Sequence, residues 1–150
     1  MAIRFYLNPD DVLNGVRTPL AADSTLQGSS YLNSSSLRIF TGRVPRTDAA
    51  NLLLIELNPP ATVSMSQTYD YEVRVHAYCD LLSNGQIPSN CNKIVERCEQ
   101  ILNDRILTVT NANCRPMVSL GIIPAYYDES DTLDKAHAVL RLEVRVDPTS

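Results

Sequence analysis

His76 and His137 are the residues whose type and position could support chemistry. Each lies in a stretch that alternates between apolar and polar residues, YDYEVRVHA at 69–77 and AHAVLRLEVRV at 136–146. This period of two is typical of a β-strand with one buried face, and both histidines fall on the polar face. If the strands pair, the imidazoles could meet, and an acidic neighbour could complete a metal site. We favour the simpler interpretation of two solvated histidines on a sheet surface.

A cysteine near His76 raises a second possibility. Cys79 follows His76 by three residues, so a small enzyme with a Cys–His catalytic pair is an alternative of a different class. The four cysteines, at 79, 91, 98 and 114, have wide, irregular gaps that match no zinc ribbon, finger or redox pair. The spacing therefore predicts free thiols in a reducing compartment and no metal or other cofactor.

Other catalytic motifs are missing from the sequence. The five glycines are scattered and none begins a phosphate-binding Gly-Lys-Ser/Thr motif. No serine lies between two glycines, as the nucleophile of a serine hydrolase would. The acidic run at 128–134 lacks the glycine and the final glutamate of a calcium loop. We therefore expect a protein that is not an enzyme.

Composition limits the remaining classes. A chain of 150 residues fits one domain and can bury enough surface to be stable without a metal or disulfide. Its net charge of −4 argues against a protein whose main task is to neutralise phosphates. The start MAIRFYL is followed at once by polar residues, so no signal peptide or membrane span is expected.

The first third of the chain predicts one helix and a long loop. Pro9 and two aspartates suit a helix start near Asp10, and the apolar residues that follow recur at helical spacing, although Pro19 would end or kink the helix. The serine-rich run 23–37 predicts a mobile loop.

The rest of the chain predicts a sheet and one more helix. Strands are expected at 37–41, 51–57, 69–77, 106–110, 117–123 and 136–146, with a turn at 111–113 and an acidic loop at 124–135. An apolar stripe predicts an amphipathic helix over 92–105 with Asn92 as its N-cap. The fold class expected is α+β, a single domain over 1–150 with a mostly antiparallel sheet and helices packed on one face.

The order of these elements resembles the tail-completion or tail-terminator proteins of long-tailed bacteriophages. The resemblance covers nearly the whole chain, from LRIFTGRVP and ANLLLIEL through YDYEVRVHAYCD and KIVERCEQILNDRI to the closing IIPAYYDESDTLDKAHAVLRLEVRV. It is carried by element order, since the family has no invariant catalytic motif. The serine-rich run 23–36 departs from the pattern.

The resemblance implies a structural virion protein that forms a ring, expected to be a hexamer, at the head-proximal end of the tail tube. The ring would end polymerisation of the tube and offer the surface that joins tail to head. Its partners would be other copies of itself, the tail-tube protein and a neck or head-completion protein. DNA would pass through the lumen without tight binding, and the protein would be assembled in the host cytoplasm and reside in the virion tail.

Two loops are expected to make the partner contacts. Tyrosine pairs are enriched at interfaces, and the first contact region comprises Tyr126, Tyr127, Asp128, Glu129 and Asp131. The second comprises Arg43 and Arg46. Two alternatives remain open: a neck or head-closure connector one layer nearer the capsid, and a monomeric binding module that uses the serine-rich run.

Overall fold

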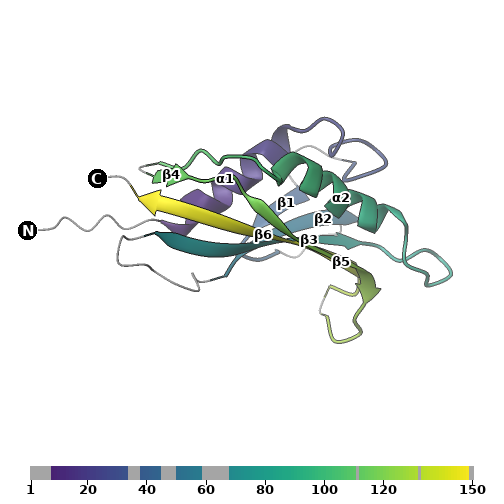
Figure 1. The fold of residues 1–150 in the computed structure, drawn as a ribbon. Coiled ribbons are helices and arrows are strands. Elements are labelled where there is room, and N and C mark those ends of the chain that lie inside the picture. Colours follow the sequence, from purple (N-terminus) through teal and green to yellow (C-terminus); the bar gives the residue numbers. More distant parts are fainter. Residues whose placement is uncertain are drawn as a thin grey trace, which may run out of the picture.

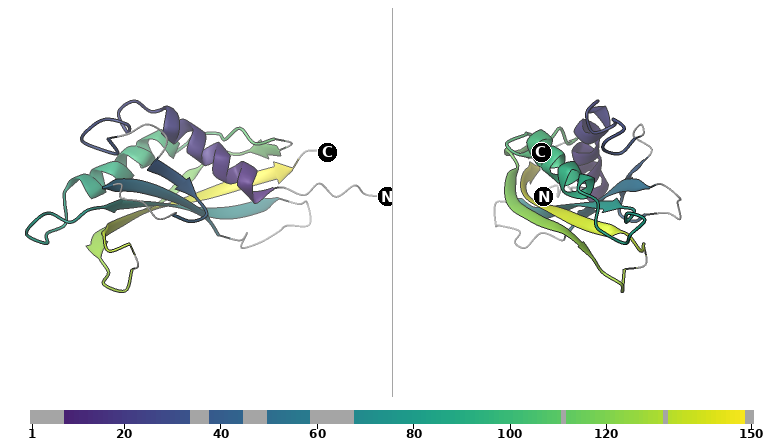
Figure 2. Two further views of the ribbon diagram at one scale, coloured as in Figure 1. Left: turned by 180° about the vertical axis from the view of Figure 1, so that it is seen from behind. Right: turned by 90° about the vertical axis from the view of Figure 1, so that its right-hand side faces the viewer.

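The computed structural model describes residues 8–33, 38–44, 50–58, 68–110, 112–131 and 133–148. Two helices lie side by side on one face of a curved, six-stranded sheet (Figures 1 and 2). Within the described residues the opposite face carries no helix, and it is called the helix-free face below. The expected α+β class, with a mostly antiparallel sheet covered on one side, is confirmed. In the part of the chain described, no helix is long and apolar enough to cross a membrane.

Helix α1 (Pro9–Ala22) begins where the sequence predicts. The Asn8 side chain accepts a hydrogen bond from the Asp10 amide at 3.0 Å, and Pro9 and two aspartates occupy the first turn. The helix continues through Pro19 to Ala22, so this proline does not end it. Leu26 and Leu32 in the run after α1 are fully buried, which ties the described part of the serine-rich run to the core. The mobility expected there stays a prediction, and residues 34–37 lie outside the described residues.

Six strands follow the order β1-β2-β3-β6-β4, and β5 also pairs with β6. Their bounds are β1 Ile39–Thr41, β2 Asn51–Leu57, β3 Tyr69–Cys79, β4 Ala112–Cys114, β5 Val118–Tyr127 and β6 Ala136–Pro148. Among the described strand pairs, only β1 and β2 are parallel. The central pair β3–β6 aligns eleven residues, from Tyr69 opposite Val146 to Cys79 opposite Ala136.

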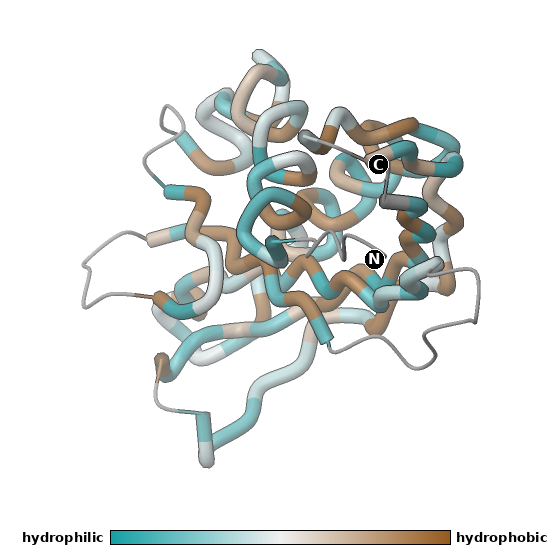
Figure 3. The backbone as a smooth tube through the Cα atoms, turned by 90° about the vertical axis from the view of Figure 1, so that its left-hand side faces the viewer, coloured by the Kyte–Doolittle hydropathy of each residue, from teal (hydrophilic) through white to brown (hydrophobic). Residues whose placement is uncertain are grey.

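The core lies between the sheet and the helices. The alternating residues of β3 and β6 predicted to face inward are buried, except Tyr69 at the start of β3, which is half-buried; Figure 3 shows how hydrophobic and hydrophilic residues interchange along the chain. Helix α2 (Asn90–Leu102) buries Ile94, Val95, Cys98 and Leu102 against them. Burying one large aliphatic side chain contributes about 1.5–3 kcal/mol. The inward residues of the sheet and the buried residues of α2 therefore account together for much of the free energy of unfolding.

Helix α2 begins two residues earlier than predicted, after Ser89. Asn92 is therefore not its N-cap. The Asn92 side chain instead accepts a hydrogen bond from the Ala125 amide of β5 at 2.8 Å. Asn103, just after α2, accepts one from the Ser119 amide of the same strand at 3.0 Å.

Segment 106–110 is not a strand, contrary to the prediction. Its burial alternates as in a strand, with Leu107 and Val109 inside, but no ladder partner lies beside it among the described residues. Helix α1 lies beside the segment where a partner strand would have to be. Gly15 has no side chain, so the helix backbone lies close to Thr108.

The turn predicted at 111–113 is also wrong for its described part. Ala112–Cys114 forms β4, which pairs with the C-terminal end of β6.

Candidate functional site

The end of β5 corrects the prediction for the tyrosine pair. Strand β5 continues through Pro124 to Tyr127, so Tyr126 and Tyr127 lie on a strand and not in the acidic loop. An edge strand tolerates proline because one side of it needs no ladder hydrogen bond. Both tyrosines remain exposed, at 38% each.

The acidic loop after β5 projects from the side of the sheet away from the helices (Figure 1). Asp128 and Glu129 are exposed at its start, and the hydrogen bonds of Asp128 go to Ser130 within the loop. Asp131 is partly buried, and Leu133 packs against a small apolar cluster on the helix-free face formed by Leu52, Leu54 and Tyr78. The loop therefore folds back over part of that face.

His76 and His137 meet beneath this loop. Nδ1 of His76 lies 2.7 Å from Nε2 of His137, and both residues are buried, at 7% and 8% exposure. The prediction that the strands bring the histidines together is confirmed, but the prediction that they are solvated is wrong. The imidazoles are covered by aromatic rings of β3 and β5 and by the acidic loop.

Aromatic and acidic groups surround the histidine pair. The Tyr78 ring stacks on His137 with centroids 4.3 Å apart, and the Tyr126 hydroxyl lies 3.2 Å from Nδ1 of His137. Oε1 of Glu56 is 2.7 Å from Nε2 of His76, although the direction is wrong for a hydrogen bond. Oδ2 of Asp131 is 3.8 Å from Nδ1 of His137.

Burial keeps both imidazoles neutral near pH 7. It lowers the pKa of His76 to about 4, helped by the positive charge of Arg74. It also lowers the pKa of His137, and the neighbouring His76 adds to that effect. A neutral pair can share one N–H between the facing nitrogens, with the Tyr126 hydroxyl as donor to the other side of His137.

The residues around the histidines do not form a metal centre. Within the described residues, no group of three or more His, Cys, Asp or Glu side chains is arranged to hold an ion. Glu72, an acidic residue of the same face, is engaged elsewhere: Arg141 donates to its Oε1 at 2.8 and 2.5 Å, and Arg74 and Asn58 donate to its Oε2. Although burial opposes it, these arginine hydrogen bonds lower the pKa of Glu72.

Cys79 and His76 do not form a catalytic pair. Positions 76 and 79 differ by an odd number, so their side chains leave β3 on opposite faces. Cys79 is fully buried in the helix-side core, whereas His76 is on the helix-free face. A hydrogen bond with Cys91, together with burial, raises the pKa of Cys79 above the usual range, which disfavours the thiolate that catalysis needs.

Comparisons with known proteins identify the fold. No protein-family model and no curated protein matches the sequence. The fold is similar to that of a chain in the virion of a native gene transfer agent particle, with a TM-score of 0.64 at 15% identity, over 88% of this chain and 91% of that one. A second solved structure has a TM-score of 0.59 at 12% identity, over 94% of this chain and 96% of that one. At these identities the likeness establishes a shared fold.

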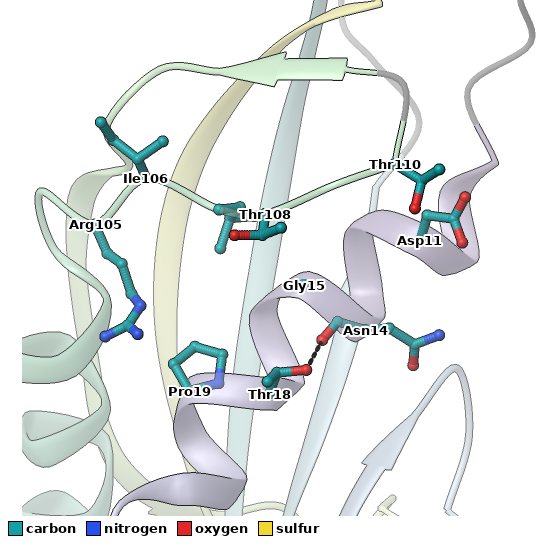
Figure 4. Close-up of a pocket in the computed structure, with 10 residues that line it drawn as sticks. Asp11, Asn14, Gly15, Thr18, Pro19, Arg105, Ile106, Thr108 and Thr110 are labelled. Carbon is teal, nitrogen blue, oxygen red and sulfur yellow. Dashed lines mark hydrogen bonds between the residues drawn. The ribbon is translucent and has the colours of Figure 1, made fainter.

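One open cavity lies apart from the histidine pair. It has a volume of about 330 Å³ and is bounded by α1 and segment 105–110 (Figure 4). Thr18 donates to the Asn14 carbonyl at 2.8 Å, and Arg105 lies at the opposite side. Neither histidine nor cysteine lines this cavity, so the groups that could do chemistry are not gathered in it.

Arg43, the first residue of the expected second contact region, is exposed just after β1. Arg46 lies outside the described residues. Arg43 and the acidic loop lie at opposite edges of the sheet, because β1 is the strand at one end of the order and β5 pairs with β6 on the side away from β3. Sequence reasoning missed the roles of Tyr78 and Glu56 beside the histidines. Only the strand order, which no local pattern contains, could have placed them there.

Proposed function

We propose that this protein is a structural component of a phage-type virion that forms a ring at the head-proximal end of the tail tube. The ring ends tube polymerisation and provides the surface to which the head or neck is joined. Tyr126, Tyr127, Asp128, Glu129, Asp131 and the arginine loop that contains Arg43 and Arg46 make the contacts between copies or with the tail-tube and neck proteins.

The observation that carries this proposal is the fold likeness to a chain of a gene transfer agent virion. The match extends over nearly the whole of both chains, so it concerns the complete domain and not a common substructure. The order of the predicted elements in the sequence also resembles that of tail-completion proteins. The two likenesses point to the same class of protein.

The polar groups of the helix-free face agree with a role beside passing DNA. Arg74 and Arg141 are paired with Glu72, and Arg145 contacts both Asp70 and Glu143. Arginines that already share a carboxylate have less to gain from a phosphate, and the whole chain is acidic. A ring whose lumen is lined by such paired charges would let DNA pass without binding it tightly.

The alternative is a neck or head-closure connector, because such a protein would also use an α+β fold, ring symmetry and contacts with neighbouring rings. The two functions differ in which assembly step fails when the protein is absent. A terminator controls tube length, whereas a neck protein controls attachment of a tail of normal length.

The test is electron microscopy of particles produced without this gene. Tails of irregular and excessive length support the terminator, and purified protein added to growing tubes should restore a uniform length. Tails of normal length that fail to join heads would support the neck alternative. Complete, infectious particles would overturn both.

A further inference from the structure

Strand β5 carries exposed apolar side chains on both faces of the sheet edge, together called the β5 patch: Tyr126 lies opposite His137 on the helix-free face, and Tyr127 lies opposite Ala136 on the other. Its ten residues, VSLGIIPAYY, include no charged side chain. Five large apolar side chains of this strand are 38–51% exposed: Val118, Leu120, Ile123, Tyr126 and Tyr127. Exposed edge strands normally carry charges that prevent association, and a grouped apolar surface marks an interaction site.

The patch is suited to side-chain packing and not to strand addition. Asn103 and Asn92 accept hydrogen bonds from the Ser119 and Ala125 amides, and the Ser119 hydroxyl accepts one from Gly121. These side chains occupy the amides that an added strand would need as donors. A partner must therefore contact the side chains of β5.

At the opposite edge of the sheet, two backbone carbonyls already accept hydrogen bonds from the same chain. The guanidinium of Arg17 donates to the Ile39 carbonyl at 3.1 Å, and the Arg43 amide donates to the Thr41 carbonyl at 3.0 Å. Two half-buried apolar side chains, Phe40 and Val44, accompany this edge. Residues 38–44 are called the β1 edge below.

The two edges carry opposite charges. The loop that continues from the β5 patch, residues 128–134, contains four acidic residues and no basic one. The β1 edge contains Arg38 and Arg43 and no acidic residue. Arg43 is exposed and has no ion pair among the described residues, and Glu129 is likewise exposed without an ion pair there.

We infer that the β5 patch and its acidic loop bind the β1 edge of a second copy of this chain. Two different complementary surfaces on opposite sides of one subunit make a head-to-tail contact, and such a contact closes into a ring when the rotation permits. Apolar side chains of β5 pack against Phe40 and Val44, while Glu129 and Asp128 face Arg43. This inference rests on the proposed ring and names the surfaces that build it.

The test uses two variants, each with one inactivated surface. Ile123→Asp places a charge in the β5 patch, and Arg43→Glu reverses the charge of the β1 edge. Both residues are exposed, so neither change should unfold the domain, which circular dichroism and thermal melting would verify. Matched controls are Ile106→Asp, at a more exposed apolar side chain outside β5 and the β1 edge, and Lys93→Glu on α2.

Sedimentation velocity over a concentration series gives the result. We expect wild type and both controls to form the closed oligomer and each variant to associate at least tenfold more weakly. An equimolar mixture of the two variants retains one competent pair of surfaces, so it should form heterodimers and nothing larger. Arg43→Glu combined with Glu129→Arg should regain association.

Three results would overturn the inference. Rings of wild type that neither variant weakens would place the contact elsewhere, while the proposed function would stand. Mixed variants that form no heterodimer would show that the two surfaces do not bind each other. Wild type that is monomeric at every concentration would exclude the contact between copies, and the tail-length experiment would then judge the proposed function on its own.

Discussion

Nδ1 of His76 and Nε2 of His137 lie 2.7 Å apart across the central strand pair, although 61 residues separate them in the chain. Burial beside Tyr78 and under the acidic loop favours the neutral form of both imidazoles, and the Tyr126 hydroxyl, 3.2 Å from Nδ1 of His137, connects the pair to β5.

Acid should destabilise the protein through His76. Its pKa is about 4 in the folded state and 6.5 when unfolded. The unfolded state therefore binds a proton first, and stability falls as pH decreases from about 6.5 towards 4. The full difference corresponds to roughly 3 kcal/mol for this residue, and His137 acts in the same direction.

Urea unfolding at pH 7.5, 6.5, 5.5 and 5.0 would measure the effect. The carboxyls of Asp23 and Glu72, whose pKa values are lowered, lose their contribution at more acidic pH, so this range isolates the histidines. The double variant His76→Gln, His137→Gln should show a flatter profile between 7.5 and 5.0. Parallel profiles for variant and wild type would contradict the assignment.

Asn92→Ala should weaken the attachment of β5 to α2. The change removes the acceptor for the Ala125 amide, at a cost of about 1 kcal/mol. Hydrogen exchange of that amide should accelerate more than exchange elsewhere in β5. Glu96→Ala, an exposed change on the same helix, serves as the control, and equal exchange at Ala125 in both variants would refute the role of Asn92.

Substitution of Gly15 should depend strongly on side-chain size. A Cβ at this position would lie 3.3 Å from the Thr108 carbonyl oxygen, a tight but adjustable contact because segment 106–110 has no strand partner among the described residues. Gly15→Ala should be close to neutral, since its gain in helix propensity of up to about 1 kcal/mol offsets the crowding.

Gly15→Val adds two methyl groups at the same point, and a cost of about 1–3 kcal/mol is expected from overpacking. Thermal melting of the two variants would compare them. A valine variant as stable as wild type would show that α1 and the segment do not pack as closely as described.

The thiols should react slowly with iodoacetamide at pH 7.5. Cys79, Cys91 and Cys98 are fully buried, and burial also raises the pKa of Cys114, the one partly exposed thiol among the four. We expect Cys114 to be modified first and the other three only with global unfolding. Rapid modification of Cys79 in the folded protein, read by peptide mass spectrometry, would restore the Cys–His enzyme alternative.

Much of the sheet could be predicted because alternation is a local property. The inward set on β3, including Tyr71, Val73 and Val75, is buried as the pattern indicates. Helix α2 was predicted on equally local grounds, although its first residue was misplaced. Segment 106–110 has the same strand pattern and failed, since a strand also needs a neighbour and α1 took that place.

The candidate site was predicted less well than the fold. Pro124 suggested that a loop begins there, but on an edge strand the missing amide costs little, and Tyr126 and Tyr127 extend β5. The partner contacts of these tyrosines, of Asp128, Glu129 and Asp131, and of Arg43 stay predictions for the experiments above.

The sequence by itself determined which side of β3, β6 and α2 is apolar, because side-chain direction repeats every two residues in a strand and every 3.6 in a helix. It also determined the charges of residues 128–134 and of residues 38–44. Only the tertiary structure decided which strands are neighbours, since pairing joins residues far apart in the chain. That long-range choice turned two expected surface histidines into a buried pair and placed the acidic loop and Arg43 at opposite edges of one sheet.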